Sequence, residues 1–303
     1  MVSCPESLVE DLLAEPLVVC AHDAGSANLI SGLLALLPEG REFSICAAGP
    51  ALDILVSQGE VLPPSAVGSL LVGAGSLLSG TSKPDVLLEH EARKEGLRRG
   101  VKTIGVIDHW INYRDRFVRE EEVLPDEIWV CDGEAFSMAE VVFSDSSVRL
   151  MPNPYLEGIL DQISGISIVH SPGTQILYVM EPFCVSWDDS GVFGEFQALD
   201  YFQSRISSLG FPDPVQVILR PHPSESPQKY VSWIEQHPGW VLSDHTEPLF
   251  KAIARADAVV GCESYAMYLA LMSGRAVYSS LPPWGPNCRL PHDSIIHLRN
   301  IQD

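Results

Sequence analysis

The chain has 303 residues, 46 % of them hydrophobic, and 40 Asp and Glu against 19 Lys and Arg give a formal net charge of −21. This length is sufficient for two domains, each with a sizeable core. The acidic balance argues against binding to nucleic acid or to an anionic membrane, because long-range repulsion opposes the approach of polyanions. An anionic small substrate would require Arg, His and helix amino ends to converge locally.

The seven cysteines are scattered and include no C-x-x-C pair. This usage indicates reduced, mostly buried cysteines in a cytosolic protein and not a disulfide framework or a zinc site. The amino-terminal residues lack a basic stretch followed by a sustained apolar run, so no secretion signal is expected. No apolar run approaches the ~20 residues that span a bilayer. We therefore expect a cytoplasmic protein without a membrane span.

Short apolar runs alternate with longer amphipathic runs through the first half of the chain, a pattern typical of parallel α/β layers. The expected strands are 17–21, 43–48, 70–72, 103–107, 127–131 and 148–151. The expected helices are 7–14, 29–37, 50–57, 84–99 and one that begins at Glu134. The run Pro152-Asn153-Pro154 then ends the pattern.

A second alternating series follows a connector over residues 155–174. Its expected strands are 176–180, 215–219, 240–242, 257–260 and 276–278, and its expected helices are 193–209, 227–236, 247–255 and 263–273. The sequence thus predicts an α/β protein with two tandem Rossmann-like domains, 1–155 and 156–303, whose parallel sheets face a central cleft. In such sheets ligands bind at the carboxyl ends of the strands.

A turn of small and polar residues, His22-Asp23-Ala24-Gly25-Ser26, follows the first expected strand. Gly25 and Ser26 let a ligand approach the backbone, and the next helix presents free amides. His22 is a candidate general base with Asp23 as its orienting partner, and Asp23 itself is an alternative base. The other interpretation is a tight turn in which Asp or Ser caps the helix. The turn is not a G-x-G-x-x-G fingerprint, so no dinucleotide cofactor is indicated.

Polar and aromatic side chains are concentrated in Asp108-His109-Trp110-Ile111-Asn112-Tyr113-Arg114, at the end of another expected strand. Loops at strand ends are where sites are built, which makes Asp108, His109, Asn112 and Arg114 candidate ligand-binding residues. The alternative is a loop with its Trp anchored in the core and its charges in solvent.

Two strand ends in the second half carry groups suited to phosphate. Arg220-Pro221-His222-Pro223 follows the strand 215–219, and Arg and His both donate hydrogen bonds to phosphate oxygens. Gly261-Cys262-Glu263-Ser264-Tyr265 opens an apolar, buried helix whose amino end attracts a diphosphate, with Ser264 as an added hydroxyl and Glu263 as an acceptor for ribose hydroxyls. The alternatives are a Pro-rich turn with solvated cations and ordinary capping by Ser264 or Glu263.

Two weaker features concern the nucleobase and metal. Thr246-Glu247-Pro248-Leu249 is a further helix start that would line a base pocket. His22, Asp108, His109 and His222 have no close ligand spacing such as H-x-x-x-H, so no metal site is expected. No Walker A sequence and no G-x-S-x-G elbow occurs.

The order of these motifs resembles the two-Rossmann-domain glycosyltransferase fold, GT-B. It is most similar to bacterial capsule and surface-polysaccharide biosynthesis proteins, which begin with a His-Asp-Ala-Gly turn and carry an Asp-His-Trp loop; the matches here are 22–25 and 108–110. The second half resembles sialyltransferase-like and polysaccharide-transferase domains. In those domains a His-Pro motif and a Ser-bearing helix start hold the donor phosphate, and the matches here are His222-Pro223 and Ser264.

The resemblance implies a glycosyltransferase that uses a nucleotide sugar as substrate and needs no cofactor or metal. The C-terminal domain would bind the donor nucleotide through Arg220, His222, Glu263, Ser264 and Tyr265. The N-terminal domain would bind a glycan or small-molecule acceptor through residues of the His22 turn and the 108–114 loop, with His22 or Asp23 as the catalytic base.

Two alternatives remain at this point. The non-hydrolysing UDP-N-acetylglucosamine 2-epimerases share the architecture, so an epimerase or hydrolase of nucleotide sugars is the first. The second is a degenerate, non-catalytic nucleotide-sugar-binding protein. The chain is short for this architecture and ends soon after residues 295–298, so the closing C-terminal helix is expected to be missing.

Overall fold

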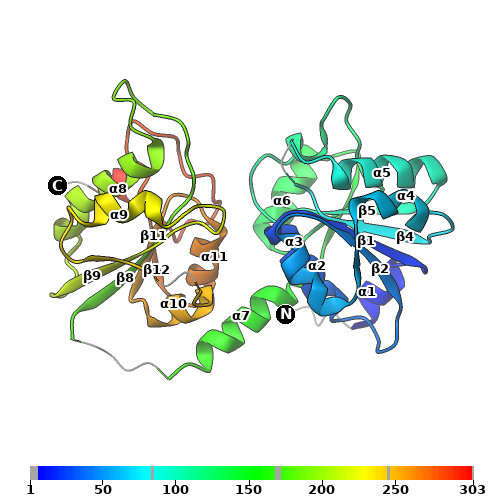
Figure 1. Ribbon diagram of the computed structural model, residues 1–303, viewed down its shortest axis with the longest axis horizontal. Coiled ribbons are helices and arrows are strands. Elements are labelled where there is room, and N and C mark those ends of the chain that lie inside the picture. The colour runs from blue at the N-terminus through cyan, green and yellow to red at the C-terminus, as the bar shows by residue number, and fades with distance from the viewer. Residues whose placement is uncertain (1–5, 83–84, 168–171, 244–245, 302–303) are drawn as a thin grey trace. The chain divides into compact units, whose positions relative to one another are not determined.

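The computed structural model describes residues 6–82, 85–167, 172–243 and 246–301. The chain divides into two compact units, Met1–Glu157 and Gly158–Asp303, called here the N-terminal and C-terminal units. Each unit is a parallel sheet with helices on both faces (Figure 1). The prediction of two parallel-sheet α/β domains is therefore confirmed.

The N-terminal unit contains a seven-stranded sheet in the order β3-β2-β1-β4-β5-β6-β7. Its strands are β1 Leu17–Ala21, β2 Phe43–Ala47, β3 Val61–Leu62, β4 Ser76–Ser79, β5 Lys102–Val106, β6 Glu127–Val130 and β7 Ser147–Leu150. Its helices are α1 Glu6–Leu12, α2 Ala24–Leu34, α3 Ala51–Leu55, α4 Val67–Leu70, α5 Leu88–Arg99 and α6 Gly133–Val142, and α7 Pro154–Ser164 continues into the next unit. The strand order reverses between β1 and β4, which is where doubly wound sheets bind ligands.

Strand β1 is buried on both faces, as its continuous apolar sequence requires. Leu17 and Val19 face the cluster formed with α1, α2 and α3, whereas Val18 and Cys20 face the cluster that includes residues of α5. The residues that follow β1 are therefore positioned by a central strand whose two faces both pack against helices.

The C-terminal unit contains a six-stranded sheet in the order β10-β9-β8-β11-β12-β13. Its strands are β8 Thr174–Val179, β9 Val215–Arg220, β10 Trp240–Leu242, β11 Ala258–Gly261, β12 Ala276–Ser279 and β13 Ile296–His297. Its helices are α8 Gly194–Arg205 and α9 Gln228–Ile234 on one face, and α10 Leu249–Arg255 and α11 Tyr265–Met272 on the other (Figure 1). The order reverses between β8 and β11, so this unit repeats the plan of the first.

One predicted strand is wrong, and three observed strands were not predicted. Residues 70–72 end α4 and turn, and the strand is Ser76–Ser79 instead. Its serines are buried without an unpaired hydroxyl, because Ser76 donates to the Ala14 carbonyl and Ser79 to the Ile104 carbonyl. The strands β3 and β13 have two residues each, too few to produce a periodic signal.

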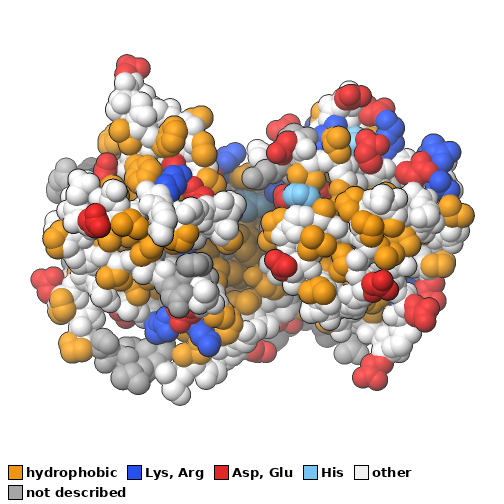
Figure 2. All heavy atoms as spheres, viewed as in Figure 1, with side chains coloured by type: hydrophobic (Ala, Val, Ile, Leu, Met, Phe, Trp, Pro, Cys, Tyr) orange, Lys and Arg blue, Asp and Glu red, His pale blue; other side chains and the backbone are white. Residues whose placement is uncertain are grey.

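The acidic balance of the sequence is visible at the surface. Asp and Glu side chains are spread over the face shown in Figure 2, among fewer Lys and Arg side chains. Among the described residues, no helix combines the length and apolar character needed to cross a bilayer.

Candidate functional site

The turn after β1 holds a histidine and an aspartate in direct contact. His22 Nδ1 lies 2.7 Å from Asp23 Oδ1, and because a carboxylate only accepts, Nδ1 is the donor. Neutral His22 therefore keeps its lone pair on Nε2. A Cβ at Gly49 would lie 2.7 Å from both Cε1 and Nε2 of this ring, so the glycine, at φ +55°, lets the imidazole lie against the backbone.

The carboxylate of Asp23 forms a hydrogen bond with His22 and does not cap α2. Asp23 occupies the N-cap position of α2 without a side-chain capping bond. Ser26 Oγ donates to the Asp23 carbonyl at 3.2 Å and so also leaves the helix amides uncapped. Simple capping by Asp or Ser, the alternative interpretation of this turn, is not what the structure has.

A buried carboxylate that was not predicted from the sequence accepts a hydrogen bond from the backbone of this turn. Glu89 of α5 is 1 % exposed, and its Oε1 accepts from the backbone N–H of His22 at 2.9 Å and from Ser82 Oγ at 2.7 Å. Its Oε2 has no hydrogen-bond partner among the described residues. Burial raises the pKa of Glu89, while Arg93, itself buried and donating to the Gly80 carbonyl at 2.9 Å, opposes that rise. The charged sequence of α5 gave no sign of this burial.

Asp108 is brought to the same turn, as the sequence analysis expected. A Cβ at Gly25 would overlap the Asp108 carboxylate, so this side chain lies against the first turn of α2. Its Oδ1 pairs with Arg116 Nη1 at 2.6 Å, and the same nitrogen donates to the Thr81 carbonyl at 2.8 Å. Arg116 was not predicted, and it is the cation that links the ends of β4 and β5.

The remaining residues of the 108–114 loop differ in burial, from the buried Trp110 to the exposed Arg114. Trp110 is buried and its Nε1 donates to Asp132 Oδ1 at 3.0 Å, which anchors the loop to the start of α6. His109 packs edge-on against Trp110, and Asn112 has the left-handed φ of 57°. Arg114, with 60 % of its side chain exposed, pairs with Glu122 at 2.6 Å. The prediction of Arg114 as a ligand contact therefore has no support from its described partners.

At the corresponding edge of the C-terminal unit, His222 is oriented by its own loop. The backbone N–H of Ser224 donates to His222 Nδ1 at 3.2 Å, and the Ser224 hydroxyl lies 2.7 Å from the same atom. Because Nδ1 accepts, a neutral His222 carries its proton on Nε2 and presents a donor there. Arg220, which ends β9, pairs in register with Val179 and donates from Nη2 to the Glu247 carbonyl at 2.8 Å.

At the start of α11, a serine caps the helix and the carboxylate of Glu263 is paired with Arg289. Ser264 Oγ accepts from the Ala266 N–H at 3.2 Å, so it caps the helix. Glu263 is 3 % exposed, and Arg289 binds both of its oxygens, with Nε 3.1 Å from each. Tyr265, in the first turn, packs against Tyr268 with ring centroids 5.4 Å apart. The carboxylate of Glu263 is thus already engaged by a cation in this structure.

A second carboxyl group missed by the sequence analysis follows β8. Glu181 Oε2 accepts from the Glu263 backbone N–H at 2.6 Å. Burial raises the pKa of Glu181 to about 8, and the nearby charge of Glu263 adds to the rise. Glu181 is the second residue after the first strand of the C-terminal unit, as Asp23 is the second residue after β1, and this position is the signal that could have identified it.

The raised pKa of Glu181 predicts a specific pH dependence of stability. An unfolded Glu ionises near 4.5, so between about 4.5 and 8 the folded chain keeps a proton that the unfolded chain has lost. The wild-type chain therefore loses stability as the pH rises through this window. We expect Glu181→Gln to raise Tm by about 5 °C at pH 9 and by much less at pH 5. The exposed control Glu235→Gln should change Tm at neither pH, and a pH-independent effect of Glu181→Gln would contradict the assignment.

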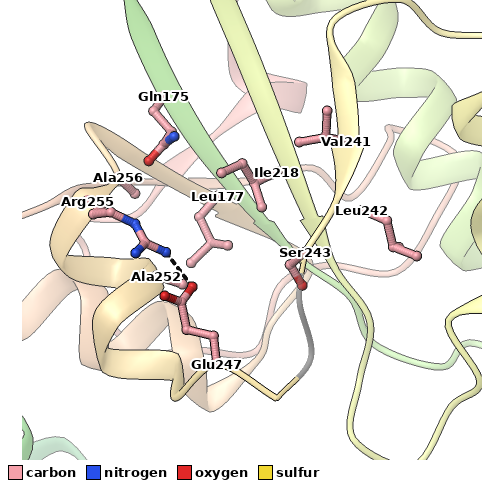
Figure 3. Close-up of a pocket in the computed structure, with 10 residues that line it drawn as sticks. All are labelled: Gln175, Leu177, Ile218, Val241, Leu242, Ser243, Glu247, Ala252, Arg255 and Ala256. Atoms are coloured by element: carbon pink, nitrogen blue, oxygen red, sulfur yellow. Dashed lines mark hydrogen bonds and ion pairs between the residues drawn. The ribbon is translucent and has the colours of Figure 1, made fainter. Parts of the chain in front are cut away.

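A pocket of about 310 Å³ lies beside the expected base-binding segment (Figure 3). Leu177, Ile218 and Val241 line it from β8, β9 and β10, and an ion pair between Glu247 and Arg255 borders it on the α10 side. Glu247, from the segment 246–249 that the sequence singled out, lines this pocket.

The ends of β9, β8 and β11 lie next to one another at the carboxyl edge of the C-terminal sheet. The Met180 N–H donates to the Arg220 carbonyl at 2.9 Å, and a Cβ at Gly261 would lie 2.8 Å from Val179 Cγ2. Arg220 and the Glu263–Ser264 turn therefore belong to one edge. Within the described parts of the chain, no three His, Cys, Asp or Glu side chains are arranged to hold a metal ion.

No protein-family model and no curated protein matches the sequence. Solved structures do match. UDP-GlcNAc 2-epimerase from Methanocaldococcus jannaschii has a TM-score of 0.59 at 10 % identity, with 87 % of this chain and 83 % of that chain covered. The enzyme from Neisseria meningitidis, bound to UDP-GlcNAc, has a TM-score of 0.56 at 10 % identity, with 87 % and 81 % covered. At this identity the likeness establishes the fold, and the chain is a two-domain α/β protein of the GT-B type.

Proposed function

We propose that this protein is a glycosyltransferase that moves a sugar from a nucleotide-activated donor to a glycan or small-molecule acceptor. The observation that carries the proposal is the His22–Asp23 pair at the reversal point of the N-terminal sheet, with Nε2 as the proton acceptor. In the reaction, His22 Nε2 takes the proton of the acceptor hydroxyl as its oxygen attacks the anomeric carbon. Asp23 stabilises the imidazolium that forms.

The proposed acceptor site is the surface around this pair. Gly25 and Ser26 lie in the first turn of α2, and Asp108 lies against that turn. Asp108 is charge-paired with Arg116, and His109 and Asn112 continue the same loop. The loop is anchored through Trp110, so these groups are held in place before the acceptor arrives.

The proposed donor site is the carboxyl edge of the C-terminal sheet. The diphosphate would accept hydrogen bonds from His222 Nε2, from Arg220 and from the amides of the first turn of α11, including that of Tyr265. The leaving nucleotide phosphate would then be stabilised by fixed donors without a metal ion. A diphosphate tolerates the two local glutamates because Arg289 neutralises Glu263, and Glu181 keeps its proton below about pH 8.

The test on the donor side is nucleotide binding by calorimetry, with UDP, GDP, CDP, CMP and dTDP as ligands. We expect one of them to bind, and His222→Ala to weaken that binding about tenfold or more, as the loss of one hydrogen bond to a charged group implies. His237→Ala is the matched control, since this histidine packs on Trp233 at the end of α9. Equal affinity in His222→Ala and the wild-type chain would contradict the donor site.

The second candidate function is epimerisation or hydrolysis of a nucleotide sugar. It is favoured by the likeness of the fold to UDP-GlcNAc 2-epimerases. Incubation with UDP-GlcNAc alone, followed by product analysis, separates the candidates. Conversion without an acceptor supports the epimerase or hydrolase, whereas donor consumption that requires an acceptor supports the transferase. Nucleotide binding without turnover across a broad panel would identify a non-catalytic binding protein.

A further inference from the structure

Another pocket of the C-terminal unit is lined by none of the proposed donor residues and has a half-exposed indole in its wall. The pocket measures about 330 Å³ and lies along one side of α8. Residues of α8, of the loop after β8 and of the loop after β12 line it: Asp188, Ser190, Val192, Gln197, Asp200, Tyr201, Ser204 and Trp284. All of these belong to the described part of the chain, and none of them is Lys or Arg.

Trp284 is the distinctive residue of this pocket. It is 51 % exposed, which is unusual for the largest apolar side chain. Its orientation is nevertheless defined, because Nε1 donates to Gln197 Oε1 at 2.7 Å and the ring packs edge-on against Tyr201. The edge of the indole is thus held by protein while the side chain stays half in solvent.

The two loops that carry the pocket are fixed to each other. The Trp187 ring packs so closely against Gly194 and Gly285 that a Cβ at either glycine would collide with it. Arg299 Nη2 donates to the Gly285 carbonyl at 2.8 Å, which holds the loop after β12. A preorganised surface of this kind loses little entropy on binding.

The carboxylates of Asp188 and Asp200 each use one oxygen, Oδ1, for their hydrogen bonds to the described residues. Asp188 accepts from the Ser190 N–H at 3.0 Å and from Gln197 Nε2 at 3.0 Å, and both bonds go to Oδ1. Asp200 accepts from Trp233 Nε1 at 2.8 Å, also through Oδ1. Hydrogen bonds from Ser190 lower the pKa of Asp188, which keeps it ionised. Among the described residues, the hydrogen bonds of both aspartates go to Oδ1, which leaves Oδ2 to face a ligand's donors.

Tyr201 packs against the pocket from the core side. It lines the pocket with 8 % of its surface exposed, and its hydroxyl makes no hydrogen bond with the described residues.

From these features we propose that the pocket binds one unit of a neutral saccharide. The C–H face of a pyranose ring is apolar and flat enough to stack on the half-exposed indole, while its hydroxyls donate to the carboxylates of Asp188 and Asp200. The absence of cations among the lining residues disfavours uronic or sialic acids, whose carboxylates would meet two like charges. The site belongs to the C-terminal unit alone, so it does not depend on the function proposed above.

The test is saccharide binding by the 303-residue chain without nucleotide. The probes are methyl glycosides of glucose, galactose, mannose and N-acetylglucosamine, their neutral di- and trisaccharides, and glucuronate- and sialate-containing analogues. Saturation-transfer NMR and calorimetry measure binding. We expect at least one neutral saccharide to bind with a Kd on the order of millimolar, and Trp284→Ala to weaken it tenfold or more.

Two further variants keep the test decisive. Asp200→Asn retains the acceptor for Trp233 while removing the charge, and should weaken binding several-fold without altering the fold. Phe193→Ala removes another exposed aromatic of the same unit that does not line the pocket, and should bind as the wild-type chain does. The proposal is overturned if no neutral saccharide binds, if acidic saccharides bind better, or if Trp284→Ala binds normally. A change of oligomeric state in Trp284→Ala, with no saccharide bound, would identify a protein interface instead.

Discussion

Replacing His22 with alanine is expected to lower kcat by about 10²- to 10⁴-fold while leaving donor binding unchanged. This range is the usual contribution of a positioned general base. The donor residues lie in the C-terminal unit, whereas His22 and its partners Asp23 and Glu89 lie in the N-terminal unit. The measurement is the initial rate of nucleotide release with donor and acceptor, together with calorimetry of donor binding alone.

The Asp23→Asn variant examines the orientation of the base. An amide cannot stabilise the imidazolium as a carboxylate does, so we expect a smaller but clear loss of kcat with the fold intact. Asp53→Asn, an exposed acidic residue in the first turn of α3, is the matched control. Full turnover in His22→Ala would show that His22 is not the catalytic base. A loss of donor binding in that variant would assign His22 to the donor site instead.

Replacing Gly25 with alanine is expected to destabilise the N-terminal unit by about 1 to 3 kcal/mol, the typical cost of overpacking. The new methyl group would overlap the Asp108 carboxylate. Asp108 cannot move away cheaply, because it is paired with Arg116, which is itself bound to the Thr81 carbonyl. The measurement is urea unfolding of the full chain, followed by far-UV circular dichroism.

Gly68→Ala provides the matched control for this substitution. Gly68 lies in α4 of the same unit, and a Cβ there has no heavy atom within 4 Å. Alanine is the better helix former, so this variant should be as stable as the wild-type chain or slightly more stable. If Gly25→Ala unfolds at the same urea concentration as Gly68→Ala, Asp108 does not pack against α2 as described.

The sequence was sufficient to predict the elements with strong periodicity and the turns that follow them. The apolar run 17–21 is β1 and a helix follows it, although α2 begins at Ala24 and not at Leu29, so residues 24–26 of the expected turn are already helical. The run 215–219 is most of β9, and Arg220 ends that strand. These predictions succeed because a strand buried on both faces needs a continuous apolar run, and because small or polar residues must follow where the chain turns.

Charged residues show where the sequence could not decide. Glu89 and Arg93 look like the exposed face of a charged helix, yet both are buried beneath the His22 turn. Arg114 and Arg116 are two residues apart, and only Arg116 turns inward to Asp108. The strand Ser76–Ser79 was missed for a related reason, since its hydroxyls are satisfied by backbone carbonyls of distant segments.

The sequence by itself therefore determined the alternation of strands and helices, the two-domain α/β class and the strand ends where polar groups gather. Those properties follow from local periodicity and turn chemistry, which neighbouring residues set. Only the tertiary structure decided which charges are buried, which partner each one has and which carboxyl groups have a raised pKa, as for Glu89 and Glu181. The physical reason is that burial and ion pairing arise between segments far apart in the chain, so no local pattern encodes them.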